Sequence, residues 1–386
     1  MHRPSRIFAD NDLNGQQGQL ADWLWLALTE LHLSFTQSRK LVQQWPHIEE
    51  LFYNIDLNQL RHFLSRQQLE RWQRLRKIDL PTHFRQHYRW LQTHQTHLLT
   101  WHDVCFPKQL KLLHDCPGWL WVQGNIDLLA DPAIAMVGGR RASPSGLALA
   151  KEYAQALASA GLTVVSGLAI GVDGASHAGA LAVGGDTIAV LGSGLAKIYP
   201  ARHQQLAKDI VTSGGALVSP WPLFLPAMPH QFPARNSIVS GLSLGVLVVE
   251  AAPKSGSLIT AKTALEQGRE VFALPASTHN RQAQGSLGLL REGACLVYTP
   301  QQIIAELAPM LSESITRPAA TEQCSPTQHL SAQLQQLLNQ FGSDPLPIDI
   351  ICQQLALPYA EVAAQLMELT LLGYLAEGPQ GYERIG

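Results

Sequence analysis

From about Trp101 to Leu307, short apolar strands alternate with helical segments, and this alternation restricts the fold more than any other feature of the chain. Strands that are apolar along their whole length are buried on both faces, which is typical of a parallel sheet covered by helices. We therefore predict an α/β fold with a doubly wound, mostly parallel sheet. The predicted strands are Ile134–Val137, Thr163–Ser166, Thr187–Leu191, Ala216–Ser219, Gly245–Val249, Val271–Ala273 and Cys295–Val297.

The rest of the 386-residue chain differs in composition and in the spacing of its apolar residues, which predicts further domains. Residues 1–100 carry apolar side chains at helical spacing and contain almost no glycine, so we expect an N-terminal all-α domain before the strand-rich domain at 101–310. Residues 311–328 are polar and contain prolines, and we expect a linker. Residues 329–386 have the pattern of a winged helix, in which three helices are followed by a pair of β-strands. We expect the three helices at Ala332–Phe341, Ile348–Leu355 and Tyr359–Leu372.

The first strand runs into a glycine-rich loop, Gly138-Gly139-Arg140-Arg141-Ala142-Ser143-Pro144-Ser145-Gly146, and then into a helix. A strand, a glycine turn and a helix N-terminus together favour anion binding. The spacing matches neither the dinucleotide fingerprint nor the P-loop, and Thr163–Ser166 ends without the acid that would hold a ribose hydroxyl. Because arginine suits phosphate, the two arginines predict that the loop binds phosphates. The spacing and the missing acid predict that these phosphates belong neither to NAD nor to a hydrolysed nucleoside triphosphate.

Further loops follow the later strands, and they should gather at the same edge of the sheet. They carry Gly167, Gly192, Gly194 and Arg202, then the segment Pro229–Asn236 with Phe232, and finally Glu250–Ser257. Arg140 and Arg202 are candidates for phosphate contacts, and Phe232 offers a face on which a base can stack.

Each of these residues also has a plainer interpretation. The glycines can serve only as turn residues, and a phenylalanine flanked by proline is often a core anchor. Ser255 and Ser257 are expected to cap a helix. His177 lacks a carboxylate or serine partner at a telling spacing, so we expect it to be packed rather than catalytic.

The formal net charge is −2, so the chain as a whole has no basic field that would indicate nucleic acid. Its charge is unevenly distributed, because the last domain carries one arginine and six acids, and we expect that domain to contact protein rather than DNA. An arginine-rich stretch is expected to be a solvated helix face or a weak DNA contact; its basic residues are Arg61, Arg66, Arg71, Arg74, Arg76, Lys77, Arg85 and Arg89.

Two classes of protein are disfavoured by the sequence. The five cysteines include no C-x-x-C pair, which argues against a structural zinc site. The N-terminus is polar where a signal peptide would be apolar, and no stretch approaches eighteen consecutive apolar residues. We therefore expect a soluble cytoplasmic protein with no membrane partner.

The ordered motifs resemble the DNA-processing protein DprA/Smf family over roughly residues 105–300. The motifs that carry the resemblance are Gly138-Gly139-Arg140…Ser143, Val165-Ser166-Gly167-Leu168-Ala169-Ile170-Gly171-Val172-Asp173…His177, Leu191-Gly192-Ser193-Gly194…Tyr199-Pro200, Gln231-Phe232-Pro233-Ala234-Arg235-Asn236 and Glu250…Ser255-Gly256-Ser257.

The resemblance implies an extended Rossmann-like domain that binds single-stranded DNA without sequence preference. It further implies protection of incoming DNA in natural transformation, loading of RecA recombinase, and a homodimer formed through the central domain. It implies no catalytic residue, metal or cofactor. By motif, Arg140 would hold a phosphate and Phe232 would stack a base, while Arg235 and Asn236 would shape that turn. The glycines that would let the backbone approach the DNA are Gly138, Gly139, Gly167, Gly192 and Gly194.

The chain departs from the family pattern at several positions. Gly139 stands where the family usually has serine, Ser237 where it has a second arginine, and His203 where asparagine is common. The loss of that arginine is expected to weaken phosphate contacts there. A phosphoribohydrolase of the lysine-decarboxylase-like group is the alternative enzyme, but the P-G-G-x-G-T-x-x-E run typical of that group is absent. A duplex binder acting through the acidic last domain is disfavoured by its charge.

Overall fold

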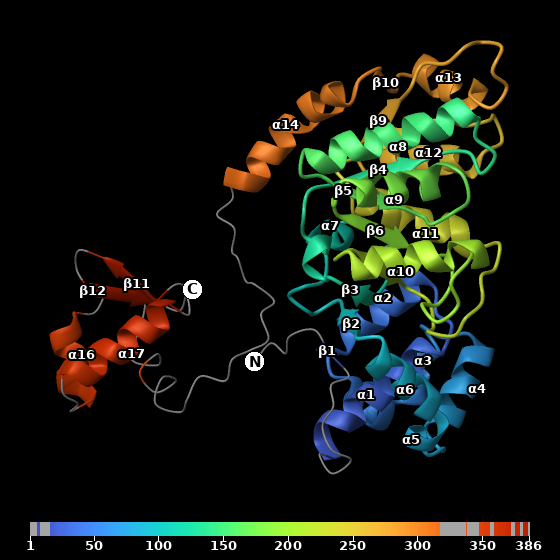
Figure 1. Ribbon diagram of the computed structural model, residues 1–386. Coiled ribbons are helices and arrows are strands. Elements are labelled where there is room, and N and C mark those ends of the chain that lie inside the picture. Colours follow the sequence, from blue (N-terminus) through green and yellow to red (C-terminus); the bar gives the residue numbers. More distant parts are fainter. Residues whose placement is uncertain are drawn as a thin grey trace. The chain divides into compact units, whose positions relative to one another are not determined.

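The computed structural model describes residues 6–7, 16–316, 337, 347–355, 359–371, 375–378 and 381–384 (Figure 1). The chain divides into two compact units, residues 1–324 and residues 325–386. Each unit is described by itself below. In the described residues, no helix combines the length and the apolar character that a membrane crossing needs.

A ten-stranded sheet forms the centre of the first unit, in the order β1-β2-β3-β7-β6-β5-β4-β8-β9-β10. The seven strands from β7 to β10 in this order are parallel to one another, which confirms the predicted doubly wound, mostly parallel fold. The strands are β1 Arg6–Ile7, β2 Thr96–Thr100, β3 Trp119–Gly124, β4 Ala133–Val137, β5 Thr163–Ser166, β6 Thr187–Val190, β7 Ala216–Ser219, β8 Gly245–Val248, β9 Glu270–Ala273 and β10 Cys295–Leu296.

Three antiparallel strands at one end of the sheet were not predicted. β3 pairs with β7 through Trp121 and Ser219, β2 pairs with β3, and β1 pairs with β2. β2 lies within residues 1–100, for which only helices were expected. Its side chains are nearly all buried, so β2 lacks the polar alternation by which a half-exposed strand is recognised in a sequence.

Helices cover both faces of the sheet (Figure 1). Alternate residues of β4 face opposite ways: Ile134 and Met136 belong to one core, and Ala135 and Val137 belong to the other. The first core includes residues of α8 Pro144–Ser159, α9 Val172–Ala182 and α14 Pro300–Thr316, and the second includes residues of α7 Lys108–Lys111, α11 Gln231–Gly241 and α12 Gly256–Glu266. The other elements of this region are η2 Asp127–Leu129, η3 Ala201–His203, α10 Gln204–Thr212 and α13 Gln284–Arg291.

Helix α14 runs further than the sequence indicated. It continues to Thr316 and so enters the segment 311–328 that was expected to be a linker. Pro300 occupies its first position, where proline is favoured, and Pro309 lies within it. The polar composition of 311–316 therefore does not end the helix, and the linker residues after Thr316 lie outside the described ones.

The N-terminal helices form the helical region that the sequence predicted. They share one core with the antiparallel end of the sheet, because Trp119 and Trp121 of β3 pack in the same buried cluster as Leu24, Trp25 and Trp72. The elements are α1 Gln16–Thr29, α2 Phe35–Gln44, η1 Glu50–Asn54, α3 Leu57–Leu60, α4 Arg66–Leu75, α5 Leu80–His83 and α6 Arg85–Thr93.

The second unit contains α16 Ile348–Leu355, α17 Tyr359–Leu371 and an antiparallel pair, β11 Leu375–Gly378 with β12 Gly381–Arg384. These bounds agree closely with the second and third predicted helices and with the β pair that follows them. The predicted helix Ala332–Phe341 lies outside the described residues except at Leu337, which is buried.

Candidate nucleic-acid interface

A cleft at the carboxyl edge of the sheet lies where the strand order reverses. From β4 the chain proceeds to β5, β6 and β7 on one side, whereas β8, β9 and β10 lie on the other. Open α/β sheets bind ligands at this switch point. The cleft has a volume of about 400 Å³ and is lined by Arg140 after β4, Gly167 after β5, Lys254 after β8, Phe232 at the start of α11 and Ser255 before α12.

An arginine and a phenylalanine form the centre of the cleft. The guanidinium carbon of Arg140 lies 5.2 Å from the centroid of the Phe232 ring, within the range of a cation–π contact. Arg140 is exposed and Phe232 is half-buried. Arg141 and Lys254 are also exposed and line the same cleft, so three exposed cations border the cleft that contains Phe232.

The segment that carries Phe232 is a helix rather than the loop that the sequence indicated. α11 begins at Gln231, so Phe232 and Pro233 lie in its first turn. Proline is tolerated there because the first N–H groups of a helix have no partner within the helix. The proline that was taken as the boundary of a loop therefore stands near the start of a helix.

The ring of Phe232 packs closely against Gly192. A Cβ added at Gly192 would lie 2.8 Å from Cδ1 of Phe232, so a side chain at residue 192 would displace the ring. The ring of Tyr199 lies 5.7 Å from that of Phe232 and is half exposed. Sequence reasoning missed Tyr199 as a second aromatic beside Phe232, because only the fold brings the two rings together.

Arg235 lies beneath the cleft and is only 3% exposed. Its Nη1 donates to the carbonyl oxygens of Gly167, at 2.6 Å, and of Val190, and its Nε donates to Oδ1 of Asn236 at 3.2 Å. Burial lowers the pKa of Arg235 to about 10, so the side chain keeps its charge at neutral pH. Arg235 thus connects the loop after β5 to β6 and α11 through hydrogen bonds.

Asp173 lies beside Arg235 and supports the same loop. Its Oδ2 accepts hydrogen bonds from the N–H groups of Gly167, at 3.1 Å, and Ala169, at 3.4 Å. Burial raises the pKa of the Asp173 carboxyl, and the Arg235 charge opposes this shift. A Cβ at Gly167 would lie 2.6 Å from the Arg235 guanidinium carbon, so this glycine is required by internal packing.

The Glu250 carboxylate lies at the N-terminus of α8, where it bonds the N-cap residue Ser143. Oε2 of Glu250 accepts from the Ser143 N–H at 2.6 Å, and Oε1 accepts from the Ser143 hydroxyl at 2.9 Å and from Nδ2 of Asn280 at 2.6 Å. The main-chain oxygen of Glu250 accepts from the Gly139 N–H at 2.6 Å. Two N–H groups of this loop, those of Gly139 and Ser143, are therefore bonded to Glu250, and phosphate binding at the loop stays a prediction.

Two of the remaining candidate glycines, Gly138 and Gly194, are also packed closely against protein atoms. A Cβ at Gly138 would lie 2.4 Å from Cγ2 of Val172, and one at Gly194 would lie 2.1 Å from the Pro222 oxygen. At Gly139 the nearest atom is 3.4 Å away, so the serine usual in the family would fit there. Packing alone thus accounts for the absence of side chains at Gly138 and Gly194.

Arg202 and His203 lie in η3, and neither is among the residues that line the cleft. Arg202 is exposed, whereas His203 donates from Nδ1 to the Leu168 oxygen at 2.9 Å. Leu168 has a φ of 55°, an unusual value for a non-glycine residue. His203 therefore supports the strained loop after β5, and this contact explains how histidine fits where asparagine is common.

The plainer interpretations of His177 and Ser255 are confirmed. His177 is fully buried, its Nδ1 lies 2.7 Å from the Thr187 hydroxyl, and burial lowers its pKa to about 3. Ser255 caps α12 by accepting from the Ser257 N–H at 3.4 Å. Within the described residues no cluster of histidine, cysteine, aspartate or glutamate could hold a metal ion.

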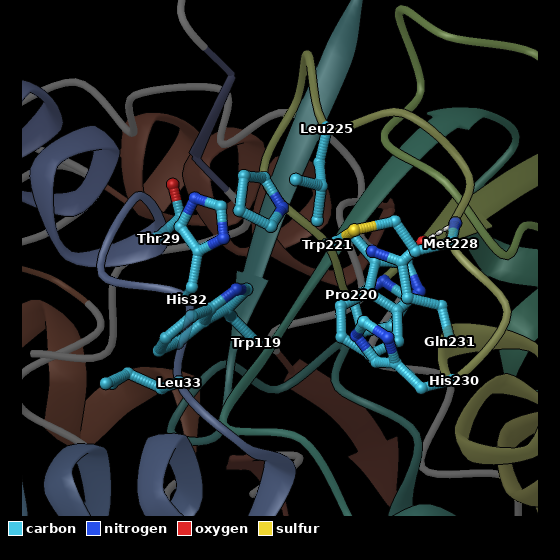
Figure 2. A pocket seen from close by; sticks show the side chains of 11 residues that line it. Thr29, His32, Leu33, Trp119, Pro220, Trp221, Leu225, Met228, His230 and Gln231 are labelled. Carbon is cyan, nitrogen blue, oxygen red and sulfur yellow. Dashed lines mark hydrogen bonds between the residues drawn. The ribbon is translucent and has the colours of Figure 1, made fainter. Parts of the chain in front are cut away.

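A smaller cavity lies behind the start of α11 (Figure 2). Its volume is about 70 Å³, well below the roughly 300 Å³ of ordinary ligand pockets. Thr29, His32 and Trp119 lie on one side, and Met228 and Gln231 lie on the other, where Gln231 Oε1 accepts from the Met228 N–H at 2.7 Å. None of these residues borders the cleft at Phe232.

The chain matches known families along most of its length. Residues 97–308 match the DNA recombination-mediator protein A family, and residues 319–381 match the DprA winged helix domain. Protein Smf of Escherichia coli is 42% identical over 296 residues, which cover 77% of this chain and 79% of that protein. The DNA processing protein DprA of Streptococcus pneumoniae is 42% identical over 204 residues, covering 53% of this chain and 72% of that protein.

Solved structures agree with this match. The X-ray structure of DprA from Streptococcus pneumoniae superposes with a TM-score of 0.63 at 33% identity, covering 74% of this chain and 97% of that one. A DprA structure from Helicobacter pylori, described for its single-stranded DNA binding mode, gives a TM-score of 0.50 at 30% identity, covering 55% of this chain and 96% of that one. The chain thus belongs to the DNA recombination-mediator protein A family, whose relatives carry the names DprA and Smf.

Proposed function

We propose that this protein binds single-stranded DNA without sequence preference, at the cleft around Arg140 and Phe232. The observation that carries the proposal is an exposed guanidinium 5.2 Å from a half-buried aromatic ring at the switch point of the sheet. Cations beside stacking platforms are how proteins bind a single strand irrespective of sequence. The Helicobacter pylori relative, described for its single-stranded DNA binding mode, supports the same ligand.

In this proposal the phosphates are held by side chains. Because Glu250 takes the N–H groups of Gly139 and Ser143, the side chains of Arg140 and Arg141 supply the phosphate contacts of this loop. A base stacks at Phe232, a contact worth about 1–3 kcal/mol. The exposed Tyr199 lies beside Phe232 and offers a second aromatic contact to the DNA. From there the DNA continues to Arg202, the candidate phosphate contact that lies outside the cleft.

The biological role follows from family membership. We infer that the protein protects incoming DNA and loads RecA recombinase in natural transformation and recombination, as a homodimer formed through the central domain. The end domain, with six acids and one arginine, serves as a protein-contacting module.

The protein acts by binding rather than by catalysis in this proposal. Support comes from the candidate catalytic groups, since His177 is buried beside Thr187 and Ser255 is a helix cap. The phosphoribohydrolase run is absent from the sequence. Release of free base from a nucleotide by the purified protein would revive the enzyme alternative.

Fluorescence anisotropy with labelled oligonucleotides tests the function. We expect the full-length protein to bind oligo-dT and oligo-dC with similar Kd, to bind a duplex of the same length more weakly, and to lose affinity as salt rises. Absence of oligo-dT binding at low salt would refute the proposal. A strong preference for one base would refute its sequence independence.

A further inference from the structure

Glu250 joins three loops that follow neighbouring strands. It lies after β8, it bonds Ser143 in the loop after β4, and it bonds Asn280 in the segment after β9. β4, β8 and β9 are adjacent in the sheet. The side chain is only 4% exposed, and three donors converge on its two oxygens.

The position of this carboxylate is one that a ligand phosphate takes in other sheets. A helix that follows a glycine turn at the switch point presents free N–H groups and a favourable dipole to phosphate. Here the N–H and the hydroxyl of the N-cap residue Ser143 are directed at Glu250, and the same hydroxyl accepts from the Gly146 N–H at 3.0 Å. Gly146, in the first turn of α8, makes room for it, because a Cβ there would lie 2.4 Å from Oε2.

Glu250 also fixes the residues on either side of Arg140. Its main-chain oxygen accepts from Gly139 at 2.6 Å, and its Oε2 accepts from Ser143 at 2.6 Å. The segment Arg140–Ala142 is therefore held at both ends, because the residue before it and the residue after it each bond to Glu250. This arrangement directs Arg140 outward to Phe232, where its guanidinium carbon lies 5.2 Å from the ring.

We propose that Glu250 determines the ligand class of this cleft by occupying the phosphate position at the N-terminus of α8. Free pyrophosphate and the diphosphate of a nucleotide are excluded because their site holds a carboxylate. A DNA strand is accepted because its phosphates need only the arginine side chains outside that site. Glu250 thus acts through Ser143 and Arg140 and does not contact the strand.

The test compares two ligands in Glu250→Ala, measured by calorimetry with inorganic pyrophosphate and by anisotropy with labelled oligo-dT. The variant removes the carboxylate, so pyrophosphate can accept the hydrogen bonds of Ser143 and Asn280 that Glu250 accepts in the wild type. Pyrophosphate affinity should therefore rise by roughly tenfold or more over the wild type. Oligo-dT affinity should fall, because Arg140 loses its support. Simple damage to the fold would lower oligo-dT affinity without creating pyrophosphate binding, so opposite changes for the two ligands identify this role.

Glu270→Ala is the matched control, because it removes an exposed glutamate from neighbouring β9 and should change neither affinity. A folded Glu250→Ala that gains no pyrophosphate binding overturns the inference, and so does a wild type that binds pyrophosphate as tightly as the variant. If circular dichroism shows that Glu250→Ala is unfolded, Glu250→Ser takes its place, because it leaves a hydroxyl that can bond to Ser143. Only the oligo-dT measurement rests on the proposed function, so the pyrophosphate result decides the inference independently.

Discussion

Phe232 lies close to two arginines that have opposite surroundings. The guanidinium carbon of Arg140 is 5.2 Å from the ring centroid and that of Arg235 is 5.9 Å from it, yet Arg140 is exposed and Arg235 is buried. The exposed arginine is free to meet a phosphate, whereas the buried one holds main-chain oxygens. Substitution of the exposed arginine should therefore affect DNA binding, whereas substitution of the buried one should affect stability.

Phe232→Ala should weaken oligo-dT binding by about 1–3 kcal/mol, because a stacking face is lost without loss of charge. The slope of log Kd against log salt should stay unchanged, since no phosphate contact is removed. Anisotropy at several salt concentrations measures both quantities. Phe232→Tyr keeps the ring and should keep the affinity. A changed slope in the alanine variant would contradict the stacking role.

Arg140→Ala should weaken binding and reduce the salt slope by roughly one, as expected for one lost phosphate contact. Arg140→Lys keeps the charge and should restore the slope. Arg291→Ala is the matched control, because Arg291 is an exposed arginine at the end of α13 that does not line the cleft. Equal slopes for wild type and Arg140→Ala would remove Arg140 from the interface.

Arg235→Met should lower the stability of the fold rather than only the affinity for DNA. The Gly167 and Val190 oxygens lose their buried donor, and each unsatisfied buried group costs about 1–3 kcal/mol. Urea denaturation measures the change in the free energy of unfolding. Arg141→Ala, at an exposed arginine of the same cleft, should leave the stability nearly unchanged. A fully stable Arg235→Met would show that the loop is held by other contacts.

His177 should make the fold less stable as the pH falls. Burial lowers its pKa to about 3, well below the 6.5 usual for histidine, so between these values the unfolded chain binds a proton that the folded chain does not. The contribution is complete above pH 6.5 and is lost towards pH 3 at roughly 1 kcal/mol per pH unit. Urea denaturation from pH 7 to pH 5 should show a shallower pH dependence in His177→Gln than in the wild type. His114→Gln, at an exposed histidine, should match the wild type.

Deletion of residues 330–386 should leave oligo-dT affinity unchanged. These residues belong to the second compact unit and carry an excess of acids, which repel phosphates. Anisotropy with the shortened protein tests this directly. Loss of oligo-dT binding would show that the end domain contacts DNA.

The parallel strands could be predicted because burial on both faces leaves runs such as Ile134–Val137 wholly apolar. The start of α11 was not predicted because a proline such as Pro233 occurs both at loop boundaries and in the first turn of a helix. The roles of Glu250 and Tyr199 depend on which strands and loops become neighbours across the sheet. That adjacency is set by topology, and local sequence patterns do not encode it.

The core that β3 shares with the N-terminal helices limits how this protein can be divided into fragments. The change of sequence texture near residue 100 lies at the end of β2, whose residues pair with Trp119–Gln123 of β3. A fragment that begins at residue 101 would leave β3 as an unprotected apolar edge, able to pair with the same edge of another molecule. Aggregation of such a fragment would then reflect the cut itself, so DNA binding by the sheet is best measured with the N-terminal helices in place.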